Sequence, residues 1–278
     1  MTANSSIRWR ARGLRTLTTT IAAAAAVAAC DMEDSGSDLI FIDGRAVAAQ
    51  GDSVLAMSLP GVSGILIRNR HTGEIDTLGA NELNSPVHFQ WVNDKWYISD
   101  VRDGRPVIVV LSAHGDVEGR IELDTVASAP HQFAVLEDGR IIVESRDSRL
   151  VALSEDSSTT FALVQASSRT GLLVAAHGGV LYAIPDRSIT LYNALGRIRW
   201  RLDWPWTKST FAADLAVDSQ GRPHVIAGQQ GRPGFVVFGL SPITGEVVRW
   251  SEEGPFATFV VDRMGNIEPD SASNWLGK

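Results

Sequence analysis

Polar and ionisable side chains recur through much of the chain at a spacing of 40 to 44 residues. Histidine, glutamine, aspartate and threonine occupy equivalent positions of successive repeats, and only Leu172 interrupts the series. Donors and acceptors that converge in a folded chain can hold a small polar ligand or a metal. The candidate ligand-binding residues in and beside this series are His88, His131, Gln132, Asp214 and Thr258.

Metal chemistry would require several of these side chains to converge as ligands. Of the six histidines, only His88 and His131 belong to this set, and Asp214 supplies its carboxylate. Such a group could serve a metal-dependent hydrolase or lyase, which we keep as the alternative function. Because the group is small, we assign the chain neither a metal nor a cofactor.

Motifs for nucleophilic catalysis and for phosphate binding are absent from the sequence. There is no Gly-x-Ser-x-Gly elbow, and the single cysteine, Cys30, lies in an N-terminal stretch that reads as an export signal. In the turn 231–234, Pro233 removes an amide that a phosphate cradle would need. We therefore name no catalytic residue and expect a non-enzymatic protein.

A tryptophan-rich segment, Trp200-Arg-Leu-Asp-Trp-Pro-Trp206, ends one of the repeats. Strand alternation places Trp200 and Trp204 on one face, where large aromatic side chains would pack between repeats. Pro205 ends the strand and leaves Trp206 in a loop. Because Trp beside Arg is favoured at binding hot spots, Trp206 joins the candidate ligand-binding residues.

Short alternating runs of Val, Ile, Leu and Phe, separated by Gly, Asp, Asn and Pro, predict β-strands throughout the chain. The clearest repeat, 130–153, reads as strand, Asp-Gly turn, strand, polar turn and strand. Asp-Gly between alternating apolar runs is a strong hairpin signal. A recurrence of about 40–45 residues with four strands in each copy is typical of a β-propeller.

The turns divide the chain into repeats. The last stretch, 255–278, is too short for four strands, and an incomplete sheet would expose an edge. We expect the strand Leu39–Asp43 to complete it, because the two termini commonly close a propeller. The predicted fold, over residues 39–278, is all-β: a six-bladed β-propeller of four-stranded antiparallel blades, closed by N- and C-terminal strands, with five or seven blades as alternatives. The complete repeats are expected at 46–84, 85–128, 129–168, 169–209 and 210–254.

The glycine turns and alternating strands resemble the NHL-like repeats of six-bladed propellers found in bacterial lipoproteins. That resemblance implies that the first strand of each blade lines a central channel, where the aligned polar series would meet a ligand, or simply water. Gluconolactonase-like propellers are also similar in architecture. They hold a divalent metal with Glu, Asn and Asp on inner strands, whereas no Glu stands at the aligned positions here.

The first 29 residues read as a signal peptide. Four arginines and no acids precede an apolar stretch, 16–29, as in secretory signals. This stretch is shorter than the roughly 20 apolar residues of a transmembrane helix. The stretch Val27-Ala-Ala-Cys30 resembles the lipobox of bacterial lipoproteins, in which the cysteine becomes the lipid-bearing N-terminus. Residues 30–38 would then be the lipidated Cys30 and an acidic tether.

Charge excludes one class of partner. Without the first 29 residues the formal charge moves from −7 to −11, because that stretch holds four arginines and no acids. An acidic surface repels nucleic acid, so we expect no nucleic-acid partner. The expected protein is a lipoprotein of the bacterial cell envelope, extracytoplasmic and anchored in the inner or outer membrane through Cys30. Its propeller would act as a binding scaffold for a protein, peptide or glycan.

Overall fold

Antiparallel strands make up the regular secondary structure in the described part of the chain. In the computed structural model, consecutive strands pair into five four-stranded sheets and one two-stranded sheet. None of the described segments forms a helix long and apolar enough to span a membrane. The described residues are 46–49, 54–58, 63–69, 71–123, 126, 132–154, 157–164, 171–176, 178–185, 187–204, 210–217, 222–229, 235–250, 258–261 and 267–270.

Each sheet is a meander in which neighbours in sequence are neighbours in space. The first sheet contains β1 (Ala46–Ala49), β2 (Val54–Met57), β3 (Ile65–Asn69) and β4 (Ile75–Leu78). The second contains β5 (His88–Val92), β6 (Lys95–Arg102), β7 (Arg105–Ser112) and β8 (Val117–Glu122). The third contains β9 (Phe133–Val135), β10 (Ile141–Glu144), β11 (Arg149–Ser154) and β12 (Ser157–Leu163).

The C-terminal half continues the same arrangement. The fourth sheet contains β13 (Leu172–Ala176), β14 (Gly179–Ile184), β15 (Ser188–Asn193) and β16 (Ile198–Asp203). The fifth contains β17 (Thr210–Val217), β18 (Pro223–Gln229), β19 (Phe235–Leu240) and β20 (Val247–Trp250). The two-stranded sheet pairs β21 (Thr258–Val261) with β22 (Ile267–Asp270).

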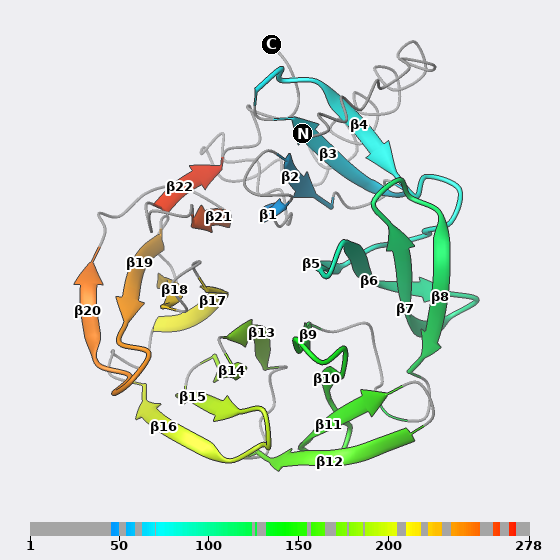
Figure 1. The fold of residues 1–278 in the computed structure, drawn as a ribbon. Coiled ribbons are helices and arrows are strands. Elements are labelled where there is room, and N and C mark those ends of the chain that lie inside the picture. The colour runs from blue at the N-terminus through cyan, green and yellow to red at the C-terminus, as the bar shows by residue number, and fades with distance from the viewer. Residues whose placement is uncertain are drawn as a thin grey trace, which may run out of the picture. The chain divides into compact units, whose positions relative to one another are not determined.

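The sheets are arranged around a common centre, with the first strand of each innermost (Figure 1). These first strands contact one another in sequence from β1 through β5, β9, β13 and β17 to β21, and β21 in turn contacts β1. The chain is therefore an all-β propeller of small antiparallel sheets. Each four-stranded sheet lies within one predicted repeat, so that part of the prediction is confirmed. The predicted closing strand, Leu39–Asp43, lies outside the described residues.

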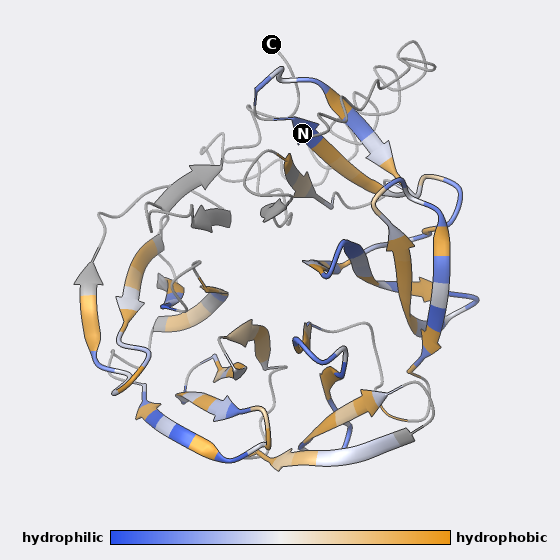
Figure 2. Ribbon diagram, in the orientation of Figure 1, coloured by the Kyte–Doolittle hydropathy of each residue, from blue (hydrophilic) through white to orange (hydrophobic). Residues whose placement is uncertain are grey.

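The hydrophobic core is divided among the interfaces between neighbouring sheets. In β7, Val107 and Val109 pack with the first sheet, whereas Ile108 packs with the third. Both faces of such a middle strand are buried, which is why apolar residues run through it without alternation. The outer strands β8 and β16 instead show alternating hydropathy (Figure 2), because one side of each faces solvent.

The outer turns form a second, repeated contact between sheets. The turn between β7 and β8 places Gly115 against Leu78 of the preceding sheet. In the same way Gly196, between β15 and β16, meets Phe161, and Gly245, between β19 and β20, meets Trp200. A Cβ at Gly245 would lie 2.6 Å from Cε3 of Trp200, so only glycine permits this approach.

Candidate functional site

His88 opens β5, and its side chain contacts the next sheet. The residue is 2% exposed, and Nε2 of its ring lies 3.2 Å from the carbonyl oxygen of Phe133 in β9. The ring also packs edge-on against the Phe133 ring, with centroids 4.8 Å apart. Its main-chain N–H donates to the Ser99 hydroxyl at 3.0 Å. His88 therefore links the second and third sheets.

Gln90, two residues along the same strand, makes the shortest of these contacts with β9. Its side-chain nitrogen donates to the carbonyl of Phe133 at 2.6 Å, and its side-chain oxygen accepts the N–H of Val135 at 3.0 Å. One buried amide thus satisfies a donor and an acceptor of a neighbouring first strand. Buried main-chain groups need such partners, because an unmade bond there is costly.

Gln132 makes a similar side-chain contact between the third and fourth sheets. It directly precedes β9, and its side-chain oxygen accepts the N–H of Leu173 in β13 at 2.9 Å. The aligned residues His88 and Gln132 thus share a direction, each toward the next sheet. In the sequence series these two positions stand at or directly before the start of successive first strands. At these two positions the side chains hold neighbouring first strands together.

Asp214 occupies a local irregularity of β17. The strand register shifts between Ala212 and Asp214, as at a β-bulge, and bulges re-aim side chains. Asp214 is 9% exposed, and its Oδ1 accepts the main-chain N–H of Leu215 at 2.8 Å.

The other candidates are less fully described. Thr258 is the first residue of β21 and pairs with Asp270, whereas His131, Trp206 and Cys30 lie outside the described residues.

Two acids on second strands were missed by sequence reasoning. Asp100, on β6, is 1% exposed and accepts the main-chain N–H groups of Asn84 at 2.8 Å and Ser85 at 2.6 Å. It holds the segment that enters β5. A single acid inside a strand of otherwise buried residues, as in Lys95–Arg102, is the signal that could have identified it.

Glu144, at the end of β10, holds the entrance to the fourth sheet. Its carboxylate accepts the N–H of Gly171 at 2.8 Å and the hydroxyl of Tyr182 at 3.1 Å. Burial, and then the charge of Glu144, raises the pKa of Tyr182. The phenol therefore stays protonated and continues to donate to the carboxylate.

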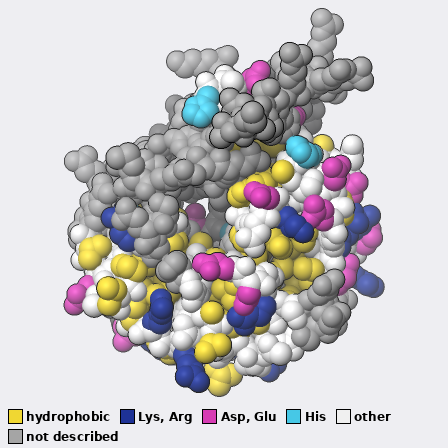
Figure 3. All heavy atoms as spheres, in the orientation of Figure 1, with side chains coloured by type: hydrophobic (Ala, Val, Ile, Leu, Met, Phe, Trp, Pro, Cys, Tyr) yellow, Lys and Arg dark blue, Asp and Glu magenta, His cyan; other side chains and the backbone are white. Residues whose placement is uncertain are grey.

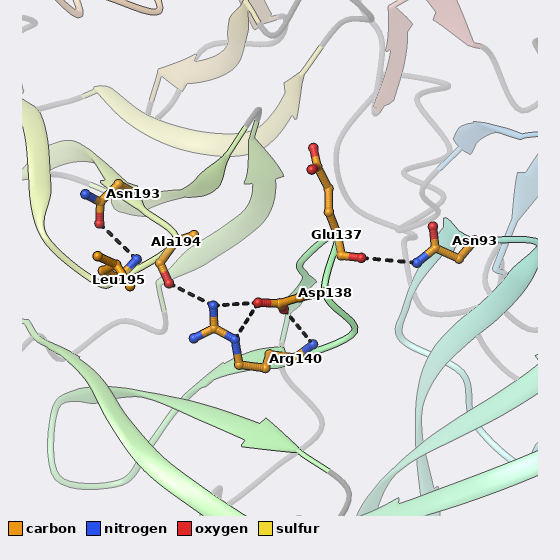
Figure 4. A network of polar contacts seen from close by, with 7 residues as sticks. All are labelled: Asn93, Glu137, Asp138, Arg140, Asn193, Ala194 and Leu195. Carbon is orange, nitrogen blue, oxygen red and sulfur yellow. Dashed lines mark hydrogen bonds and ion pairs between the residues drawn. The ribbon is translucent and has the colours of Figure 1, made fainter.

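The turns at the opposite ends of these strands are also linked (Figure 4). Arg140 pairs with Asp138 at 2.7 Å and donates to the carbonyl of Ala194, in the fourth sheet, at 2.9 Å. The hydrogen bond from Arg140 lowers the pKa of Asp138. On the other side, Asn93 donates to the carbonyl of Glu137 at 3.5 Å, a long and weak contact. These turns thus connect three successive sheets.

The described part of the tryptophan-rich segment has a packing role. Trp200 is 7% exposed, and its indole N–H donates to the carbonyl of Pro242 in the fifth sheet at 3.0 Å. Trp204 is partly buried against the same cluster. Packing between sheets, the alternative expected for these two residues, is therefore what they do.

The buried polar side chains on and beside the first strands give structural support. Among the described residues, no three His, Cys, Asp or Glu side chains converge as metal ligands would. The buried polar groups of His88, Gln90 and Gln132 are engaged with main-chain atoms of the next sheet. Such groups rigidify a scaffold, and they leave the turns and connecting segments as its variable surface.

Comparison with known proteins supports the fold. No protein-family model matches the chain, and no curated protein matches it. Many solved structures do match, all of those described next at low identity. A Bacteroides caccae protein of unknown function is 16% identical with a TM-score of 0.55, over 78% of this chain and 85% of that one.

Two enzymes are among the similar structures. Virginiamycin B lyase from Staphylococcus aureus, solved with quinupristin, is 12% identical with a TM-score of 0.52, over 76% of this chain and 68% of that one. A luciferin-regenerating enzyme is 10% identical with a TM-score of 0.55, over 80% of each chain. At such identities the likeness carries the fold alone. The chain is a β-propeller with structural neighbours among bacterial propellers.

Proposed function

We propose that this chain is a lipid-anchored, extracytoplasmic β-propeller that serves as a binding scaffold in the bacterial cell envelope. In this proposal residues 1–29 are removed, Cys30 carries the lipid and residues 31–38 form the tether. The propeller has six NHL-like blades, and Leu39–Asp43 completes the last. Its partner is a protein, a peptide or a glycan, and it binds no nucleic acid.

The observation that carries the scaffold function is the engagement of the aligned polar side chains. His88 and Gln132 would be central to any ligand set in a metal-dependent hydrolase or lyase. Both are instead bonded to main-chain atoms of the neighbouring sheet. A metal would have to compete with these bonds, whereas a scaffold benefits from them. The hydrolase or lyase therefore remains the lesser candidate.

The anchor is supported by sequence features that agree with one another. A basic stretch, a short apolar stretch and small residues lead to the only cysteine of the chain. An acidic segment follows at once, as a solvated linker would. Stable anchoring takes more than one acyl chain, so we expect the mature cysteine to carry several.

The test is intact mass and metal content of the protein purified from its own membrane. We expect a chain that begins at an acylated Cys30 and holds no stoichiometric metal, and we expect a Cys30→Ser variant to lose the lipid mass. An unmodified chain, or one that retains residues 1–29, would refute the anchor. One tightly held divalent ion per chain, together with lactone or sugar-ester hydrolysis lost in Asp214→Ala, would refute the scaffold.

Binding itself requires a separate assay. Immobilised, detergent-solubilised protein would be exposed to arrays of envelope glycans and of peptides, with Trp206→Ala and Thr258→Ala as site variants. We expect one class of ligand to bind and at least one of the variants to weaken it. Ligand binding that is unchanged in both would remove these residues from the candidate site.

A further inference from the structure

Exposed apolar side chains lie on the outer turns and outer strands of the fourth and fifth sheets. Leu195 and Ile243, in the turns before β16 and β20, are 72% and 82% exposed. Ile198 on β16 and Val248 on β20 are 58% and 60% exposed. We call these four residues the rim patch. Large apolar residues exposed together mark interaction surfaces more often than isolated ones do.

Trp200 joins the outer strand of the fourth sheet to the outer turn of the fifth. Its indole N–H donates to Pro242 at 3.0 Å, so the turn that carries Ile243 rests on β16. The β-bulge in this pairing sets Ile198 opposite Tyr192 and Trp200 opposite Leu191, so Ile198 and Trp200 face opposite sides of β16. Leu195, in the turn that meets Phe161, and Ile198 therefore lie toward the third sheet, and the rim patch extends from there across β16 to the turn of Ile243.

Arginines flank the rim patch, although the chain as a whole has a formal charge of −7. Arg197 and Arg199 are exposed beside Ile198, and Arg201 follows with 44% of its side chain exposed. Figure 3 shows hydrophobic and basic side chains interspersed along this part of the rim. Acids are present too: Asp203 pairs with Arg201 at 3.2 Å, and Glu246 is exposed.

The first and second sheets differ at the same positions. Where the fourth sheet has Leu195 at the tip of its outer turn, the second has His114, and where the fifth has Ile243, the first has His71. The outer strand β8 carries Glu118 and Glu122. Equivalent positions of one repeat are therefore apolar and basic on one side of the protein and polar on the other. The turn geometry does not require the leucine or the isoleucine.

We infer that the rim patch docks on the anionic headgroup layer of a lipid bilayer. Protruding leucine and isoleucine tips next to arginines suit the boundary between headgroups and acyl chains. Elsewhere the acidic surface would be repelled by anionic lipid, so the patch would also orient the domain. The inference rests on the proposed lipid anchor, which would hold the domain within reach of the bilayer.

The test uses the full chain reconstituted in vesicles, with an environment-sensitive dye at one introduced cysteine. Because Cys30 is the only native cysteine, its acylation leaves the new thiol as the single dye site. The variants are Leu195→Cys and Ile243→Cys, with His114→Cys and His71→Cys as their matched controls. The vesicles are phosphatidylcholine alone or with phosphatidylglycerol, with and without spin-labelled lipid.

We expect a blue shift and spin-label quenching at positions 195 and 243 in vesicles that contain phosphatidylglycerol, and neither at 114 or 71. Reversing Arg197 and Arg199 to Glu should lower the docking equilibrium by at least about fivefold for each charge removed. Arg105→Glu, an exposed arginine of the second sheet, should leave it unchanged. Equal responses at all four dye positions, or the same loss in Arg105→Glu, would overturn docking. A blue shift insensitive to spin-labelled lipid would also overturn it and indicate contact between copies.

Failure of the proposed lipid anchor can be distinguished from failure of membrane docking. If the wild-type chain takes up dye at Cys30 and does not float with vesicles, the proposed function fails. The same dye positions, in a Cys30→Ser background with excess vesicles, then decide the docking alone. A shift there sustains the rim patch, and its absence overturns it.

Discussion

The side-chain nitrogen of Gln90 lies 2.6 Å from the carbonyl oxygen of Phe133, on the first strand of the next sheet. The oxygen of the same amide takes the N–H of Val135 at 3.0 Å. No first-strand backbone pairs with that of its neighbour in the described sheets. The Gln90 side chain therefore forms hydrogen bonds with β9 that a neighbouring strand would otherwise form.

Removing this amide should destabilise the protein. Gln90→Ala leaves a buried carbonyl and a buried N–H each with one bond fewer, and we expect a loss of about 2–4 kcal/mol in the free energy of unfolding. Gln90→Glu keeps the acceptor but places a buried carboxylate against the Phe133 carbonyl, so it should lose at least as much. Urea unfolding followed by tryptophan fluorescence measures both. Asp203→Ala, which removes only an exposed ion pair with Arg201 at 3.2 Å, should stay within about 0.5 kcal/mol of wild type.

The contact of Gly245 with Trp200 can be separated from backbone strain. Gly245 has φ of +76° and Gly73 has φ of +73°, but a Cβ at Gly73 would meet nothing within 4 Å. Gly73→Ala should therefore cost only about 1–2 kcal/mol, the strain of a left-handed alanine. Gly245→Ala should cost about 1–3 kcal/mol more, because Trp200 must move. Equal losses in thermal unfolding would contradict the role of this contact.

Acid should weaken the protein partly through Asp147. Hydrogen bonds from Arg149 and then Ser145 lower the pKa of Asp147 from 3.8 to about 2. The unfolded chain lacks these partners, so this contribution to stability is present above about pH 4 and is lost as the pH falls toward 2. Asp147→Asn should flatten the pH dependence of unfolding in that window, and salt should reduce the difference. Asp103→Asn, another exposed acid, is the control, and an equal flattening there would refute the assignment.

Alkali should act through Tyr182. Burial, and then Glu144, raises its pKa, whereas in the unfolded chain the phenol titrates near its ordinary value of about 10. The folding advantage of the protonated phenol is full below that value and declines as the pH rises above it. Tyr182→Phe should lose about 1 kcal/mol at neutral pH, with the hydrogen bond, but show a smaller further loss between about pH 9 and 11. Tyr97→Phe should keep the wild-type profile, and a wild-type profile in Tyr182→Phe would contradict the prediction.

Most of the sheet boundaries could be predicted because turn chemistry is local. The turn at Asn93 and Asp94 has φ of 51° and 60°, values that these two residue types tolerate, and such pairs mark hairpins in the sequence. Each repeat contains several turns of this kind. Their regular spacing therefore predicted where each four-stranded sheet begins and ends.

The use of the polar residues could not be predicted, because it depends on partners far away in the sequence. Gln90 bonds to residues 43 and 45 positions later, and Glu144 to one 38 positions later. Alignment of repeats identifies equivalent positions but not whether a side chain faces the centre or the next sheet. Trp200 was easier, since a large apolar residue between sheets has few other uses.

The glycine turns at the outer rim affect how a propeller of this kind can gain repeats by duplication. One repeat supplies both a glycine turn, which rests on the sheet before it, and a bulky outer-strand residue, which receives the turn of the sheet after it. The fourth sheet does this with Gly196 and Trp200. Tandem duplication of one repeat would therefore copy both contact elements, the glycine turn and the outer-strand residue. The new repeat could then pack against the sheet on each side of it. The glycine turn meets the side chain of Leu78 or Trp200 in two joints and the main chain of Phe161 in a third, so a glycine turn can fit against outer-strand residues of different size.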